Sequence, residues 1–348
     1  MSQSRRSFAS DNVAPAAPEV MTALARVNQG TVHSYGDDPE TRRLVELARR
    51  TFETELAIYP VATGTAANAL ALAVLAPPYG GIYCHDIAHV NTDECGAPEF
   101  YTGGAKLLPL ATPDGKLRAN QLAAPIAHAR EMGVHHVAPA AVSISQATEW
   151  GTVYQLGELR ELTAAAHAHG LSVHMDGARF ANAVAHLGCT PADASWKCGI
   201  DVLSFGATKN GALAAEAVIF FKPEMARDFE LRRKRAGQLW SKLRYMSAQL
   251  AALLADDLWL RHGRHANALA ARLAQGLQQR GVELVQPVEA NEVFAVLPSQ
   301  RVASLRAQGF EFYEWPAARP DRQPVVRLVT AYDMVEGDVD ALLAALSA

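Results

Sequence analysis

Short apolar segments alternate with helical ones up to about residue 220, and this alternation restricts the possible folds more than any other feature. Segments such as GGIYCH, LSVHMD and DVLSFG have the length and composition of buried strands. Strands that alternate with helices form a largely parallel sheet covered on both faces. We therefore expect an α/β fold built on one mostly parallel sheet of seven strands. The predicted strands lie at residues 56–62, 80–85, 106–110, 140–146, 171–176, 201–206 and 216–221.

The pattern changes after residue 230, where a long helical region covers residues 231–281 and is expected to break around 256–263. The elements predicted after it are strands at 282–287, 292–298, 311–315 and 325–331 and helices at 299–309 and 339–348. Together they make a small C-terminal α+β domain of roughly 100 residues. We predict an N-terminal arm (1–30), a large domain (31–245) and a small domain (246–348).

The charge balance and the apolar segments exclude several classes of protein. A net charge of -4 offers no electrostatic footprint for nucleic acid or an anionic membrane. The longest apolar run, ALALAVLAPP, is too short to cross a bilayer, and no apolar run follows the N-terminal MSQSRRSFASDN as it would in a secretory signal. The four cysteines lack metal-ligand spacing and are typical of free thiols in a reducing compartment. We predict a cytoplasmic protein without a metal site.

A turn of small residues opens the helix in ATGTAANAL, at Gly64 and Thr65. Backbone N–H groups and a hydroxyl at a helix N-terminus suit a phosphate. The stretch is neither a Walker motif nor a GxGxxG motif. Taken alone, a purely structural turn explains it as well as an anion site does.

Charged residues also follow two of the predicted strands. Asp176 ends the strand LSVHMD and Arg179 follows it, while Lys209 lies just past the strand DVLSFG. In doubly wound sheets, ligands bind outside the carboxyl ends of the strands. A lysine in a low-dielectric pocket can act as a nucleophile. The alternatives are that Asp176 caps a helix and pairs with Arg179, and that Lys209 is an exposed turn residue.

The three features together indicate one ligand. Pyridoxal phosphate needs a phosphate cradle, an acid that keeps its pyridine nitrogen protonated and an amine that forms a Schiff base. The turn at Gly64 and Thr65, the carboxylate of Asp176 and the amine of Lys209 would supply them. We therefore predict a pyridoxal-phosphate enzyme. A nucleotide or phospho-metabolite binding protein without chemistry at Lys209 is the alternative from another class.

The motifs SYGDDPETRRL, ATGTAANALAL, AHVNTDECGAPEFYTGGAKLLPL, VHMDGARFANA and FGATKNG resemble those of the low-specificity L-threonine aldolases, in order and over nearly the whole chain. The resemblance implies the aspartate-aminotransferase-like fold and pyridoxal 5'-phosphate as cofactor. It implies that Lys209 forms the Schiff base and that Asp176 pairs with the pyridine nitrogen. It further implies that Gly64, Thr65 and Thr208 bind the phosphate.

The resemblance also assigns residues around the substrate. His89 matches a histidine that stacks on the cofactor ring, and His135 matches a second active-site histidine. His135 is the first candidate for the base that removes the β-hydroxyl proton, and His89 is the second. Arg327 matches the arginine that holds the substrate carboxylate, for which a guanidinium fork is well suited. Ser10 and Arg179 complete the contacts to the carboxylate and the ring.

His136 adjoins His135 and is the alternative match for the second active-site histidine. The chain departs from the family pattern in two places. The lysine motif reads Thr-Lys-Asn-Gly where many members have Ser-Lys-Gly, and ISQATEWG replaces a segment that contains Asn-Thr in other members. These differences indicate a sub-branch and leave the preferred substrate open.

The resemblance predicts the activity and the assembly. The expected reaction is retro-aldol cleavage of L-threonine and L-allo-threonine to glycine and acetaldehyde. L-Phenylserine cleavage, or another pyridoxal-phosphate lyase or aminotransferase of this fold, is the alternative. The family precedent is a homotetramer, a dimer of dimers with active sites shared between subunits. In this chain Arg233, Lys234 or Lys242 would reach the neighbouring subunit's phosphate.

Overall fold

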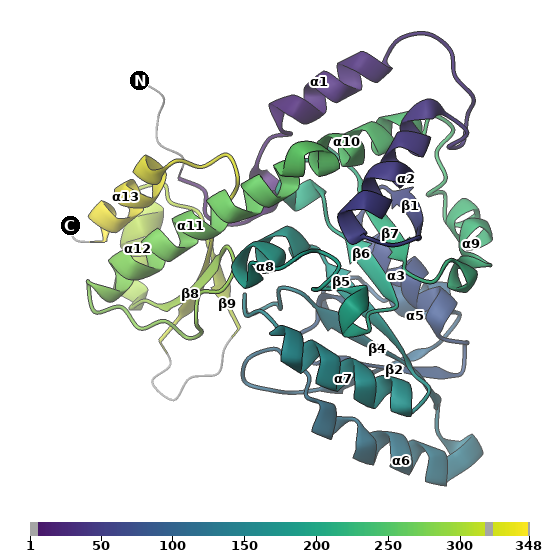
Figure 1. The fold of residues 1–348 in the computed structure, drawn as a ribbon. Helices are drawn as coiled ribbons and strands as arrows, with labels where there is room; N and C mark the ends of the chain where they lie inside the picture. The colour runs from purple at the N-terminus through teal and green to yellow at the C-terminus, as the bar shows by residue number, and fades with distance from the viewer. Residues whose placement is uncertain (1–5, 317–322, 347–348) are drawn as a thin grey trace.

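The computed structural model describes residues 6–316 and 323–346, and a seven-stranded sheet forms the centre of this part of the chain (Figure 1). The strands are β1 (Ala57–Val61), β2 (Gly80–His85), β3 (Lys106–Leu110), β4 (Ala138–Ser145), β5 (Ser172–Gly177), β6 (Val202–Phe205) and β7 (Glu216–Phe220). Their order is β1-β7-β6-β5-β4-β2-β3. The pairs from β3 to β6 are parallel, while β7 is antiparallel to both β6 and β1. The predicted mostly parallel sheet of seven strands is confirmed.

Helices cover both faces of this sheet because successive strand residues are apolar on both sides. Leu203 and Ile219 face one layer, in which α2 (Pro39–Phe52), α7 (Leu156–Ala168), α8 (Phe180–Leu187) and α10 (Arg244–Leu254) share a core. Val202 and Val218 face the other layer, which contains α3 (Gly64–Leu75) and α9 (Phe229–Arg235). The other helices of the large sheet region are α1 (Pro18–Val27), α4 (His89–Thr92), α5 (Ala97–Thr102) and α6 (Ala123–Met132).

A second, three-stranded antiparallel sheet lies toward the C-terminus (Figure 1). Its order is β8 (Glu292–Val296), β10 (Val325–Val329), β9 (Tyr313–Trp315). It shares a core with α11 (Leu258–Gln278), α12 (Ser299–Ala307) and α13 (Glu336–Ala345). The small α+β unit is therefore present as predicted, and the domain boundaries at residues 30 and 245 stay predictions.

Two local features of the C-terminal third differ from the prediction. The helical region has a break that was not predicted, at residues 236–243, where Gly237 takes a left-handed conformation (φ 73°). The break expected around 256–263 is confirmed at Asp256 and Asp257, both of which have positive φ. The segment 282–287 forms no strand and contributes an isolated bridge at Leu284. Pro287 has no N–H with which to continue a ladder.

The N-terminal segment links the small sheet to the centre of the molecule. Phe8 is fully buried in the core of the small sheet, and its carbonyl accepts a hydrogen bond from Val329 N at 2.9 Å. The short helix η1 (Asp11–Val13) follows directly. Residues 1–5 of the predicted arm lie outside the described residues.

The described residues contain no helix that is both long and apolar enough to cross a membrane. The four cysteines are unpaired: Cys84 and Cys198 are buried, Cys189 is half-buried and Cys95 is exposed.

Replacing Phe52 tests the core between α2 and the sheet. Its ring packs within 6.2 Å of those of Phe180 and Phe205 and is fully buried. We expect Phe52→Ala to lower the free energy of unfolding by about 3–5 kcal/mol, because it removes apolar contacts and leaves a cavity. The measurement is urea unfolding, with Phe100→Ala as control since Phe100 is 77% exposed. Equal effects of the two variants would contradict the packing described.

Candidate active site

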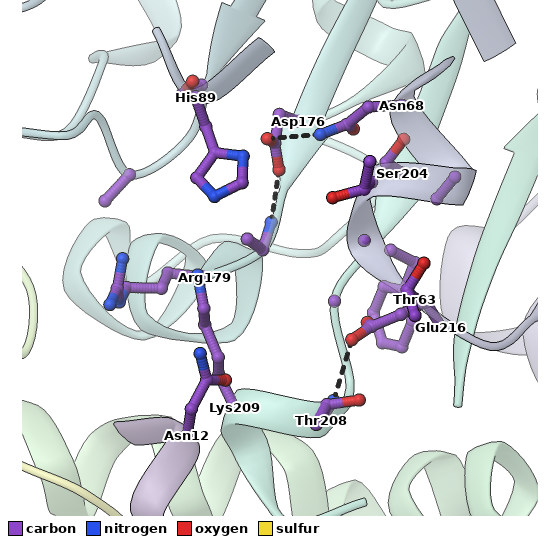
Figure 2. Close-up of a pocket in the computed structure, with 18 of the residues that line it drawn as sticks. Asn12, Thr63, Asn68, His89, Asp176, Arg179, Ser204, Thr208, Lys209 and Glu216 are labelled. Carbon is purple, nitrogen blue, oxygen red and sulfur yellow. Dashed lines mark hydrogen bonds between the residues drawn. The ribbon is translucent and has the colours of Figure 1, made fainter. Parts of the chain in front are cut away.

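A cavity of about 450 Å³ opens at the carboxyl ends of β4, β5 and β6 (Figure 2). The register of these strands places Ser145 beside Asp176 and Asp176 beside Ser204, and all three residues line the cavity. Parallel strands end at the same edge of a sheet, so the loops that follow them meet there. The strand-end residues Asp176 and Lys209 both lie in this cavity, as the sequence predicted.

The N-terminus of α3 forms one wall of the cavity. Thr63 caps the helix, since its hydroxyl accepts a hydrogen bond from Ala66 N at 3.1 Å. Gly64 and Thr65 line the cavity, and a Cβ atom added to Gly64 would meet no atom within 4 Å. The free N–H groups of this first helical turn therefore face open space, which is the environment of an anion site.

Asp176 is fixed by hydrogen bonds to both carboxylate oxygens. Asn68 Nδ2 donates to Oδ2 at 2.7 Å, and Ala178 N donates to Oδ1 at 2.9 Å (Figure 2). Asn68 lies on α3, one turn after Gly64, and also donates to Glu94 at 2.8 Å. Hydrogen bonds of this kind stabilise the ionised carboxylate.

Lys209 lies in a short turn, η5 (Thr208–Asn210), that other residues hold in place. The carboxylate of Glu216 accepts hydrogen bonds from Ala207 N at 2.6 Å and Thr208 N at 3.3 Å, and burial raises the pKa of Glu216 to about 6. Asn210 donates to the carbonyl of Trp259 on α11 at 2.9 Å. Figure 2 shows the Lys209 side chain extending from this turn toward His89 and Asp176.

The small residues before Lys209 allow the chain to pass close to the turn after β5. A Cβ atom added to Gly206 would lie 2.5 Å from the carbonyl oxygen of Ala178, well inside van der Waals contact. A side chain at this position would push β6 away from Asp176. Gly206, the first glycine in FGATKNG, is therefore required by this close approach.

His89 begins α4 and lines the cavity. Its Nδ1 atom lies 2.9 Å from Glu94 Oε1, and this hydrogen bond raises the pKa of His89 although burial opposes it. The imidazole points into the same space as Asp176 (Figure 2). His89 is thus held beside the carboxylate and favours its protonated form.

Arg179 forms the second charged cluster of the site with residues from distant segments. It makes two hydrogen bonds to Asp11, at 2.9 and 3.0 Å, and an ion pair with Glu292 at 3.2 Å. Burial would lower the pKa of Arg179, but the two carboxylates outweigh burial and raise it. Arg179 therefore does not pair with Asp176, which excludes the simple cap-and-pair alternative for that residue.

Arg327 and Ser10 adjoin the cavity without lining it. Arg327 on β10 stacks over the Trp315 ring at 4.8 Å and lies 3.7 Å from Glu292. Burial lowers the pKa of Arg327. Its guanidinium donates to the carbonyl of Ala9 at 3.3 Å, so Arg327 lies next to Ser10 in the structure.

The structure does not bring His135, the predicted catalytic base, into the cavity of its own chain, so its role stays a prediction. His135 ends η3 (Gly133–His135), is exposed, and comes before β4 begins. The amino end of a strand lies at the opposite edge of the sheet from the cavity, and His136 shares that position. Neither histidine lines the cavity.

Several residues of the site were missed. Asn68 and Glu216 hold the Asp176 carboxylate and the Lys209 turn, and Glu149, from the loop after β4, lines the cavity. Glu149 lies in ISQATEWG, close behind a predicted strand. Asp176 and Lys209 were identified because ligands bind outside the carboxyl ends of parallel strands, and the same argument could have identified Glu149. Asp11 and Glu292 carry no local signal, because tertiary folding alone brings them to Arg179.

The fold and the cavity are those of a known group of enzymes: the chain belongs to the beta-eliminating lyase family, whose family model matches residues 7–300. The chain is therefore a lyase. It is 47% identical over 314 residues to a low specificity L-threonine aldolase of Pseudomonas aeruginosa, a match that covers 90% of each chain.

Solved structures show the same fold. The chain matches a threonine aldolase of Leishmania major with a TM-score of 0.92 and 29% identity, over 99% of each chain. It also matches a serine palmitoyltransferase from S. paucimobilis that was solved with bound PLP, with a TM-score of 0.68 and 18% identity, over 98% of this chain and 86% of that one. The second likeness supports the aspartate-aminotransferase-like fold predicted from the sequence.

Asp11→Asn tests the buried ion pair with Arg179. Burial alone would raise the pKa of Asp11, but Arg179 and Lys209 lower it below 3.8. The ionised carboxylate therefore stabilises the fold above pH 3.8, and this contribution is lost as the pH falls through the lower, folded-state pKa. We expect Asp11→Asn to lower the free energy of unfolding at pH 7 by about 3–5 kcal/mol.

Urea unfolding between pH 2 and pH 7 measures this effect. Below pH 3.8, the free energy of unfolding of the variant should depend less on pH than that of the wild type. The control is Asp340→Asn, which breaks an exposed ion pair with Arg272 and should hardly move the unfolding midpoint. Similar losses in the free energy of unfolding of the two variants would mean that the Asp11–Arg179 pair contributes no more to stability than a surface pair.

Proposed function

We propose that this lyase uses pyridoxal 5'-phosphate to cleave L-threonine and L-allo-threonine to glycine and acetaldehyde. The observation that carries the proposal is the convergence of Lys209, Asp176 and the open N-terminus of α3 on one cavity, in a chain whose relatives are low-specificity L-threonine aldolases. A single ligand with an aldehyde, a basic ring nitrogen and a phosphate would meet all three groups.

The residues present fit this cofactor. The free N–H groups around Gly64 and Thr65 would bind its phosphate, with Thr208 nearby. Asp176, oriented by its hydrogen bond from Asn68, would pair with the protonated ring nitrogen. Lys209 would bond to the aldehyde carbon, and His89 would lie against the ring. When bound, pyridoxal phosphate supplies an electron sink for the bond that breaks at Cα.

The chain's own residues would orient the substrate. Arg327 presents a guanidinium that stacks on Trp315, so it is fixed in a plane that can bind a carboxylate with two hydrogen bonds. Ser10 and Arg179 lie on the same side of the cavity and would complete this contact. Holding the carboxylate fixes rotation about the bond between Cα and nitrogen, and that rotation selects which Cα bond is broken.

A cytoplasmic location and a homotetramer with shared active sites also belong to this proposal. Lys234 and Lys242 are exposed and are candidates to reach the phosphate of a neighbouring subunit, although the Lys234 ammonium lies over the Tyr35 ring at 4.4 Å. Arg233 is buried and donates to the carbonyl of Pro60 in its own subunit, so it is the weakest of the three candidates.

A product assay tests the proposed function. The purified protein, supplied with pyridoxal phosphate, should release equal amounts of glycine and acetaldehyde from L-threonine and L-allo-threonine. L-Phenylserine, assayed in parallel, measures how far the specificity extends. Formation of a keto acid in place of glycine would indicate an aminotransferase, and no reaction with any of the three amino acids would refute the proposal.

Lys209→Ala tests the assignment of the reactive amine. We expect turnover to fall by more than about 10³-fold, because the nucleophile is removed. Borohydride reduction followed by mass spectrometry should find a pyridoxyl group on Lys209 in the wild type and no adduct at residue 209 in the variant. Lys106→Ala, at an exposed residue of β3, is the control and should keep both properties. A pyridoxyl adduct on another lysine of the wild type would overturn the assignment.

A further inference from the structure

The carboxyl group of Glu149 is held at the cavity by one of its two oxygens. Oε1 accepts a hydrogen bond from the Ser145 hydroxyl at 2.6 Å and another from His89 N at 2.8 Å. These donors come from the end of β4 and the start of α4, so two separate elements fix the orientation of the group. Ser145 pairs in register with Asp176, which places Glu149 next to the predicted position of the cofactor ring.

The other oxygen, Oε2, is shielded from solvent and receives no hydrogen bond from the residues that the structure describes. Leaving a buried carboxylate oxygen without a donor costs free energy. The carboxyl group belongs to a side chain that lines the cavity, where a substrate would be bound.

The other carboxyl groups that line the cavity are already engaged. Both oxygens of Asp176 accept hydrogen bonds, as do both oxygens of Glu216. His89 Nδ1 is bonded to Glu94, and this bond raises the pKa of His89. Among the described carboxyl groups of the lining, Glu149 is the one with an oxygen that receives no hydrogen bond.

We propose that Glu149 is the catalytic base that takes the β-hydroxyl proton of the substrate, the role for which the sequence put His135 first. This inference rests on the proposed function. The proton would move from the hydroxyl to the Glu149 carboxylate, and the electron pair of the O–H bond would become the second C–O bond of the departing aldehyde. Bound pyridoxal phosphate would supply the electron sink that takes the pair of the Cα–Cβ bond. The carboxyl group would then release the proton to water while Cα gains one, so no net proton is consumed.

The surroundings of Glu149 suit a base that works near neutral pH. Burial raises the pKa of Glu149 to about 7, and the Asp176 charge adds to this effect. A general base is most effective when its pKa lies near the operating pH. The charged and titratable groups that face it are Asp176 on β5, Arg179 before α8, Cys84 on β2, Tyr154 after β4, and His89 on α4.

Glu149→Gln tests the proposal with little change in shape, because the amide oxygen can keep both hydrogen bonds. We expect kcat on L-threonine to fall by about 10²–10⁴-fold. In the wild type, kcat/KM should decline as the pH drops below about 7, since the base becomes protonated, and this decline should be absent in the variant.

Two further measurements separate a base from a merely structural residue. Exchange of the Cα proton of glycine with deuterium oxide needs no hydroxyl, so Glu149→Gln should keep it within about threefold of the wild type. An infrared band of a protonated carboxyl group that titrates near pH 7 should be present in the wild type and missing in the variant, with or without pyridoxal phosphate. Cofactor affinity should be unchanged.

Glu216→Gln is the matched control, since Glu216 is a buried carboxylate of the same cavity that holds the Lys209 turn. It should impair cofactor binding and glycine exchange together with cleavage. If Glu149→Gln behaves in the same way, or keeps kcat within about threefold of the wild type, the proposal is wrong. Wild-type protein that cleaves no hydroxy amino acid would instead contradict the proposed function, so the two failures are distinct.

Discussion

The register of β4, β5 and β6 is the constraint on which the site depends. It aligns Ser145, Asp176 and Ser204 across three parallel strands at one edge of the sheet. The loops that leave these strands bring Glu149 and Lys209 to the same cavity. A shift of β5 by one residue would turn Asp176 to the opposite face of the sheet. The apolar residues that fix this register therefore also fix the chemistry.

The site concentrates charged side chains around one cavity, and most of that charge is compensated. Asp11 and Glu292 surround Arg179, while Asn68 and Ala178 N hold Asp176. Paired and hydrogen-bonded groups of this kind are costly to break but contribute modest net stability. These contacts fix the orientation of the site's side chains, because each reactive group is held by a neighbour that takes no part in the reaction. Glu149 Oε2 and Glu94 Oε2 are buried and receive no hydrogen bond from the described residues.

The sequence predicted those parts of the fold and the site that depend on local pattern. Apolar segments located the seven strands, and the strand-end rule located Asp176 and Lys209. His135 was placed by matching residue types to relatives, and in its own chain it lies before β4, away from the cavity that Glu149 lines. The Asp11–Arg179 pair could not be predicted, since it joins the N-terminal segment to α8 across the fold. The segment 282–287 lies beside β8 and bridges it at Leu284, but it forms no strand, since Pro287 has no N–H with which to continue the ladder.

The helix α11 connects two parts of the site that are distant in sequence. Its first turns accept a hydrogen bond from Asn210, next to Lys209, and bond to α8 through Asn267 and Asn182. Its last turns share a core with β10, which carries Arg327. The length of this helix thus sets the distance between Lys209 and Arg327. Chimeric enzymes that exchange C-terminal halves with relatives should therefore place their junction before Leu258, so that this spacing is inherited whole.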